Sequence, residues 1–196
     1  RSFCEAHGSN VSADMFEVAL PASSLTDKFA ASDIVTRAAE MLNKNGITVF
    51  FEAPFSEGWD GRVQKLTRAL RKVKDKHVGF KLRTGGVTAE TFPSPEQIAW
   101  AITEVREAGI PMKCTAGLHH PVRHFNQSVN GIAQTQIQSI LEDEDSASFI
   151  FGETGFEWKD LRVATSEIMR ARQSITSFGS CSFDEPLEDL RNIHLL

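Results

Sequence analysis

The sequence lacks the features that would assign it to most specialised protein classes. Its three cysteines are an odd number at unrelated positions, so they predict neither a disulfide framework nor a CxxC metal pair. No apolar run approaches the roughly 20 residues that cross a bilayer, and we expect no signal peptide. A net charge of -5 is also far from the basic excess of general nucleic-acid binders. We therefore expect a cytoplasmic protein whose partners include neither nucleic acid nor a membrane.

The length fits a single domain or one large piece of a longer protein. At 196 residues the chain can bury a substantial core. Residues 1–14 are polar and irregular, and we predict a flexible N-terminal segment there, followed by one β/α domain over residues 15–196. The chain begins at Arg1 rather than at methionine, which is consistent with the C-terminal part of a longer protein.

Hydrophobic periodicity predicts strands and helices in alternation. Runs of β-branched and aromatic residues predict the strands, and apolar residues at helical spacing predict the helices between them. One helix has a clear start, because Ser94 and Gln97 fit a capping box around Pro95. The expected strands are residues 15–20, 47–53, 78–83, 110–116, 148–151 and 175–178, and the expected helices are residues 33–45, 60–76, 94–109, 129–141, 160–173 and 186–194.

This alternation predicts an α/β fold with parallel strands and right-handed crossovers. Strands with a polar second face fit a parallel-stranded (β/α) barrel, in which that face lines the interior and the mouth. Since about six strands fall short of the usual eight, we predict a partial or incomplete barrel. A doubly wound open sheet is the alternative, disfavoured because no GxGxxG follows the first strand.

Two neighbouring strands carry cations on a single face. Alternation places Lys81 with Arg83 on one strand and Lys113 with Thr115 on the next. A buried cation without a partner is strongly destabilising, so this face should meet something anionic. Because working residues of a barrel gather at the carboxyl ends of its strands, we predict a site for a small anionic molecule there.

Carboxylates on the first two strands are candidate partners for these cations. Glu17 and Glu52 can keep the lysines charged in the interior. A purely structural ion-pair lattice is the competing interpretation, because charge networks are not always functional.

Lys113 is the sharpest catalytic candidate. Burial and the neighbouring ammonium of Lys81 would favour the neutral amine that imine chemistry requires. The alternative is that Lys113 binds a carboxylate or phosphate as a point charge. The predicted catalytic set is Lys113, Lys81, His119 and Glu52, with the histidine as acid or base.

Glycine-containing turns follow the third and the last strand, and glycine lets backbone amides approach an anion closely. Tight surface turns would look the same in the sequence. The predicted substrate-binding residues are Arg83, Thr84, Gly85, Gly86, Thr115, His120, Arg123, Gly179 and Ser180.

Metal and thiol chemistry have weaker support. Adjacent histidines on one strand point to opposite sides, and neither HxH nor HExxH spacing is present around His119 and His120. We predict no metal and no cofactor. Cys114 alternates toward the helices, so we expect it in the core.

Three long strings carry a resemblance to a known family. Residues 81–86 (KLRTGG), 113–121 (KCTAGLHHP) and 178–186 (FGSCSFDEP) resemble stretches shared by an uncharacterised family of bacterial hypothetical proteins. The resemblance spans residue 15 to the C-terminus and implies a longer N-terminal part, with no particular reaction. Residues 130–132 (NGI) depart from the family's His-Gly-Phe, so no role is carried over for that loop. At fold level the lysine-bearing strands resemble those of barrel aldolases.

Two functions compete. The first is an enzyme that binds a small carboxylated or phosphorylated substrate and uses a strand lysine, as a lyase or aldolase does. The second is a non-catalytic binding or assembly domain with a structural charge network. Because an incomplete barrel exposes strand edges, it would associate with another copy or with a missing N-terminal portion.

Overall fold

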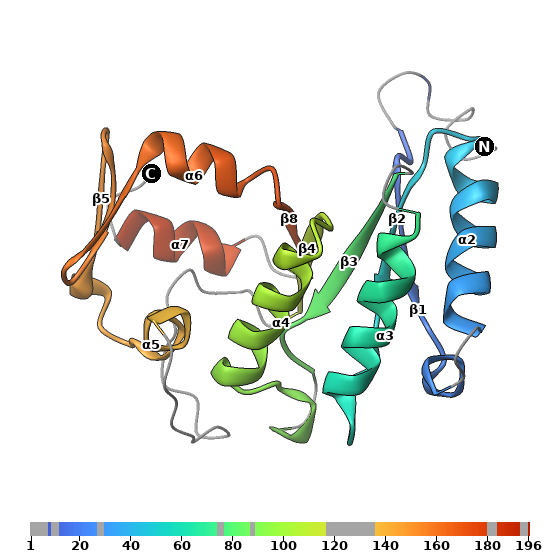
Figure 1. Cartoon of the computed structure of the whole chain (residues 1–196). Coiled ribbons are helices and arrows are strands. Elements are labelled where there is room, and N and C mark those ends of the chain that lie inside the picture. Colours follow the sequence, from blue (N-terminus) through green and yellow to red (C-terminus); the bar gives the residue numbers. More distant parts are fainter. Residues whose placement is uncertain are drawn as a thin grey trace.

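The computed structural model describes residues 8, 12–26, 30–73, 77–86, 89–116, 136–179, 184–192 and 196. Its principal element is a five-stranded parallel sheet in the order β1-β2-β3-β4-β8, which confirms the α/β class (Figure 1). The strands are β1 (Met15–Ala19), β2 (Thr48–Glu52), β3 (Val78–Arg83), β4 (Met112–Thr115) and β8 (Ile175–Gly179). The helices between the first four strands are α2 (Ala30–Asn43), α3 (Trp59–Arg71) and α4 (Pro95–Glu107), and short 3-10 helices are η2 (Ala22–Leu25), η3 (Ala89–Thr91) and η4 (Ser146–Ser148).

The strand order follows the chain without a reversal. Helices α2, α3 and α4 lie side by side on one face of the sheet (Figure 1). A doubly wound sheet instead reverses its strand order and has helices on both faces. Strands β1 and β8 are at the two ends of the sheet, and no pairing between them is present in the described part of the chain, so a closed barrel is not formed there.

The core lies between the sheet and these three helices. Alternate residues of the strands, such as Phe51, Phe80 and Leu82, have almost no exposed surface. Helix α4 begins as predicted, because Ser94 accepts a hydrogen bond from the backbone of Gln97 and the Gln97 side chain accepts one from the Ser94 backbone. This packing leaves the second face of the sheet free of helices α2, α3 and α4.

A second, antiparallel sheet replaces part of the predicted alternation. It consists of β5 (Phe149–Gly152), β6 (Gly155–Trp158) and β7 (Leu161–Ala164), in that order. The predicted helix over residues 160–173 is therefore wrong in its first part, and only α6 (Thr165–Ala171) is helical. The predicted strand at residues 148–151 exists, but it belongs to this second sheet rather than to the parallel one.

The physical reason is a cross-strand apolar face. Phe151 lies opposite Phe156, and Trp158 lies opposite Leu161. Such aromatic pairs stabilise antiparallel strands. Asp143 anchors this sheet, since it accepts hydrogen bonds from the Trp158 indole and the Lys159 ammonium, both at 2.9 Å. The hydrogen bond from Lys159 outweighs burial and lowers the pKa of Asp143 to about 2.

The remaining helices depart modestly from the prediction. Helix α3 ends at Arg71 rather than at residue 76, and α7 (Asp184–Asn192) starts two residues early. Helix α5 (Gln136–Glu142) agrees with the described part of the expected helix at 129–141. The first part of the expected helix at 129–141 lies outside the described residues. No helix in the described ranges is both long and apolar enough to span a membrane.

Candidate functional site

The face of the parallel sheet opposite helices α2, α3 and α4 carries the charges that the sequence predicted there. Strand pairing sets Lys81 directly opposite Glu52 on one side and Lys113 on the other. Arg83 is likewise opposite Thr115, two residues further toward the carboxyl ends. We call the side chains of Glu17, Glu52, Lys81 and Lys113 the charge lattice.

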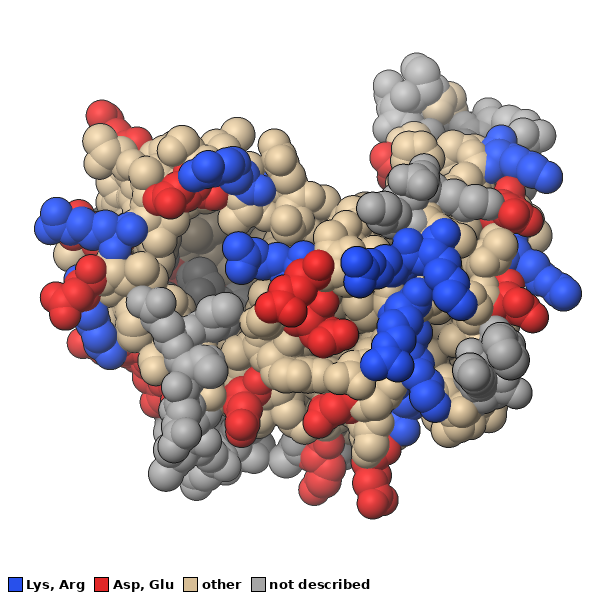
Figure 2. Space-filling view, in the orientation of Figure 1, with Lys and Arg blue, Asp and Glu red and all other residues tan. Residues whose placement is uncertain are grey.

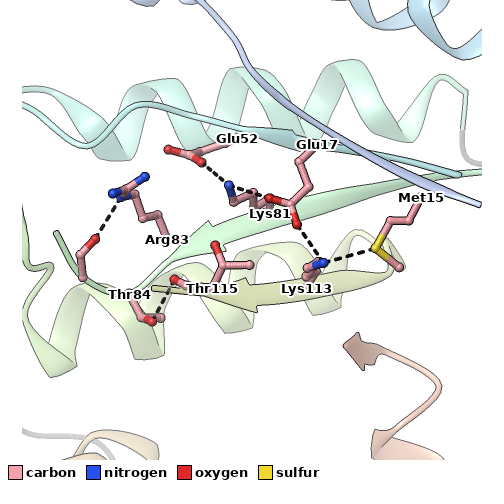
Figure 3. A network of polar contacts seen from close by, with 9 residues as sticks. Met15, Glu17, Glu52, Lys81, Arg83, Thr84, Lys113 and Thr115 are labelled. Carbon is pink, nitrogen blue, oxygen red and sulfur yellow. Dashed lines mark hydrogen bonds and ion pairs between the residues drawn. The ribbon is translucent and has the colours of Figure 1, made fainter. Parts of the chain in front are cut away.

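Lys81 is held between two carboxylates. Its Nζ lies 2.8 Å from Glu17 Oε2 and 2.9 Å from Glu52 Oε2 (Figure 3). The Lys81 side chain is only 13% exposed. Burial alone would lower the pKa of Lys81, but the hydrogen bonds and charges of the two glutamates outweigh it and raise the pKa above its ordinary value. Lys81 is therefore a fixed positive charge rather than a neutral amine.

Lys113 shares one of those carboxylates. Its Nζ lies 2.7 Å from Glu17 Oε1 and 3.2 Å from the Met15 sulfur (Figure 3). Glu17 thus bridges two ammonium groups from neighbouring strands. Burial would raise the pKa of Glu17, but the hydrogen bonds from Lys113 and Lys81 prevail and lower it.

Arg83 lies outside this lattice at the carboxyl end of β3. Its Nε donates to the carbonyl of Gly85 at 2.9 Å, and Figure 3 shows its side chain directed away from Lys113. No carboxylate in the described part of the chain forms an ion pair with Arg83. Two ammonium groups balance two carboxylates in the lattice, so Arg83 is the cation left over on this face.

The predicted glycine turn has a packing role. The Thr84 hydroxyl donates to the carbonyls of Thr115 and Ala116, which ties the end of β3 to the end of β4. A Cβ at Gly86 would collide with the Thr91 side chain. Thr84 and Gly86 are therefore explained by local packing, whereas the Arg83 side chain makes a hydrogen bond within the turn, from its Nε to the Gly85 carbonyl.

In comparisons with protein-family models, curated proteins and solved structures, none matches this chain significantly.

Strand β8 completes the site on the other side of Lys113. Ser177 pairs with Lys113, and Gly179 pairs with Thr115. A Cβ on Gly179 would lie 3.2 Å from Thr115 Cγ2 and 3.9 Å from Lys113 Cε. The missing side chain therefore keeps space open beside Lys113.

Several predicted site residues lie outside the described residues, namely His119, His120, Arg123 and Ser180. The described residues bring together Lys81, Lys113 and Glu52 from the predicted catalytic set. Glu17 and Met15 were not in that set, although both alternate onto the same face of β1. Cys114 is buried in the core, and burial raises the pKa of its thiol to about 11.

Two other features lie away from the lattice. A pocket of about 80 Å³ between α4 and β8 is lined mainly by apolar residues such as Ile102, Met112 and Ile175, so it extends the helix-side core. The cations of α3 and the residue after it gather on the outer surface of the helices (Figure 2), and they are Arg62, Lys65, Arg68, Arg71 and Lys72. Neither feature contains a lattice residue. The candidate site is therefore identified by its charged residues and not by a pocket.

Proposed function

We propose that the sheet is part of a β/α barrel and that its polar face binds a small carboxylated or phosphorylated molecule and acts on it. The supporting observation is that two lysines and two glutamates form a buried or half-buried lattice at 2.7–2.9 Å, beside Arg83, which forms no ion pair with a described carboxylate. Buried ion pairs add little net stability compared with apolar residues of similar volume. The presence of four charged groups on this face is therefore better explained by a functional role than by a contribution to the stability of the fold.

Arg83 is the anchor for the anionic group of the ligand. Its guanidinium is exposed at the carboxyl end of β3, where parallel α/β folds bind their ligands. Arginine also binds carboxylates and phosphates through two parallel hydrogen bonds.

Lys113 is the reacting amine. The ammonium first loses a proton, and the neutral amine adds to a carbonyl carbon of the substrate. The carbonyl oxygen then leaves as water, which gives an imine that acts as an electron sink for bond cleavage in a lyase or aldolase. Lys81, which its two glutamates keep charged, stabilises negative charge that develops beside this imine.

Borohydride trapping tests the reacting amine. The purified protein is incubated with a panel of 2-oxo acids and phosphorylated aldehydes, reduced, and analysed by intact mass and peptide mapping. We expect a reduced adduct on Lys113 that is lost in Lys113→Arg and kept in the control Lys65→Arg, because Lys65 lies on the helix surface and donates to the Thr26 carbonyl. An adduct spread evenly over surface lysines would count against this function.

A matched arginine pair tests the anchor. Arg83→Gln should weaken the binding of inorganic phosphate or citrate at least tenfold in calorimetry, since it removes the unpaired cation of the site. Arg71→Gln removes one exposed arginine from α3 and should leave that affinity within about twofold. Equal effects of the two substitutions would show diffuse surface electrostatics instead of a site.

One observation favours the second candidate, a structural lattice in a non-catalytic binding or assembly domain. The lattice balances its own charges, so it is complete without a ligand. If this candidate is right, no carbonyl compound is trapped on Lys113 and no anion binds, while substitutions in the lattice still lower stability.

A further inference from the structure

The two lysines of the lattice face each other across neighbouring strands. Lys81 and Lys113 are register partners on β3 and β4. Like charges directly opposite one another destabilise a sheet unless an anion lies between them. The carboxylate of Glu17 fills that position, 2.8 Å from one ammonium and 2.7 Å from the other.

The two glutamates of the lattice are held very differently. Glu52 lies on β2, which pairs on both sides, and its side chain is 9% exposed. Glu17 lies on β1, an end strand of the sheet, and its side chain is 34% exposed. Among the described residues, Glu52 forms an ion pair with Lys81 alone, whereas Glu17 forms ion pairs with both lysines. Glu17 is therefore the carboxylate of the lattice with the more direct path to solvent, and its departure breaks the two ion pairs that a ligand anion would replace.

We infer that Glu17 occupies the anion position of the site, and that the ligand takes its place between Lys81 and Lys113. This inference rests on the anion-binding part of the proposed function, and in this anion-bound state Lys113 acts as a cation rather than as the reacting amine. With Glu17 in place the lattice is neutral, as expected for a resting site that an internal carboxylate fills. When Glu17 leaves, the two lysines exceed Glu52 by one positive charge, and Arg83 adds a second.

This excess of positive charge indicates the charge of the ligand. A monoanion such as acetate only repeats the contacts that Glu17 already makes, so it gains little. A dianion, either a phosphate monoester or a dicarboxylate, matches the positive charge of the two lysines and Arg83 taken together, provided that the Arg83 side chain turns from the Gly85 carbonyl toward the lysines. The ligand therefore carries two negative charges.

The sign of an affinity change tests this inference. Inorganic phosphate, succinate and acetate are titrated calorimetrically into wild type, Glu17→Gln and the control Glu52→Gln, at one low ionic strength and with folding checked by circular dichroism. We expect Glu17→Gln to bind phosphate and succinate at least tenfold more tightly than wild type. Glu52→Gln should gain less than about threefold, because Glu17 still competes there.

A third variant separates position from charge. Glu17→Asp keeps the negative charge, but its shorter side chain does not reach both ammonium groups, so dianion affinity should rise to an intermediate value. An unchanged or weaker affinity in Glu17→Gln, or equal gains in Glu17→Gln and Glu52→Gln, would overturn the inference and leave the proposed function standing. Absence of any dianion binding in wild type and in all three variants would overturn both.

Discussion

The two faces of the parallel sheet differ in what their residues do. On the helix side, Phe51, Phe80 and Leu82 are sealed in an apolar core. On the other side, their chain neighbours Glu52 and Lys81 form ion pairs. Burial of apolar surface stabilises the fold directly, whereas a buried ion pair gains little over its desolvation cost. The comparison indicates that the apolar face stabilises the fold and that the charged face contributes little net stability, which is the basis of the proposed ligand site.

The largest effect should come from the helix side. Phe51 is 0% exposed, so Phe51→Ala leaves a cavity in the core. We expect the free energy of unfolding to fall by about 3–5 kcal/mol. Phe151→Ala is the matched control, because Phe151 is 43% exposed on the second sheet and should lose below about 1.5 kcal/mol. Urea denaturation measures both, and equal losses would remove the distinction between core and periphery.

Removing Lys81 should have the next largest effect. Lys81→Met keeps the aliphatic stem but leaves Glu52, whose side chain is 9% exposed, without its ammonium partner. Breaking a buried pair costs up to about 3–5 kcal/mol, and we expect about 2–3 kcal/mol because Glu17 is partly solvated. The surface pair is the control, since Arg170 and Glu167 are 3.9 Å apart and mostly exposed, so Arg170→Met should cost below about 0.5 kcal/mol.

Two glycines, one at the amino end of β3 and one in helix α3, test the packing around the sheet. A Cβ on Gly79 would lie within 2.6 Å of the Phe50 ring, so Gly79→Ala should destabilise by about 1–3 kcal/mol. Gly61 lies inside helix α3 with nothing within 4 Å of the added carbon, so Gly61→Ala should stabilise by about 0.5–1 kcal/mol. In thermal denaturation the two variants should change the stability in opposite directions if the packing is correct, and in the same direction if it is not.

The charge lattice should give a small, pH-dependent effect. Because the pKa of Glu17 is lowered in the fold, its stabilisation is present above the unfolded value of 4.5 and is lost as pH falls through the lower folded value. Because the pKa of Lys81 is raised, the stability that Lys81 contributes is fully present below pH 10.5 and is lost as pH rises through the higher folded value. The stability difference between wild type and Glu17→Gln should therefore be constant near neutral pH and shrink in acid. A difference that grows below pH 4.5 would contradict the lattice.

The buried thiol should have no measurable role at neutral pH. Burial raises the pKa of Cys114 to about 11, so almost no thiolate forms at pH 8. Alkylation of the native protein, mapped by mass spectrometry, should modify Cys114 only at the rate of unfolding. Rapid modification in native buffer would show that this position is open rather than part of the core.

Local patterns predicted the first four strands of the parallel sheet and the cations on its polar face. Period-two alternation suffices to place Lys81 and Lys113, because each strand sets its own faces. Neither alternation nor composition shows which carboxylate lies between two lysines. That depends on the register of β1 against β2, which is a tertiary property. The sequence therefore named Glu17 and Glu52 as candidate partners of the cations, as the ion pairs confirm, but it did not show that Glu17 bridges the two lysines.

The second sheet was missed for a different reason. Strands β6 and β7 are short and meet in a turn at Lys159-Asp160, and the charges at Arg162 and Glu167 imitate the polar side of a helix. Contacts between strands, such as Phe151 with Phe156, stabilise the antiparallel sheet. The hydrophobic periodicity of one short stretch cannot reveal such contacts.

Direct observation of the cations during anion titration tests the central claim. In nitrogen-detected NMR of arginine and lysine side chains, inorganic phosphate should shift the signals of Arg83, Lys81 and Lys113 along one saturable curve. The signals of Lys65 and Lys72 on α3 should barely move. Weak, non-saturating shifts of equal size at all of these cations would contradict an anion site on the polar face of the sheet.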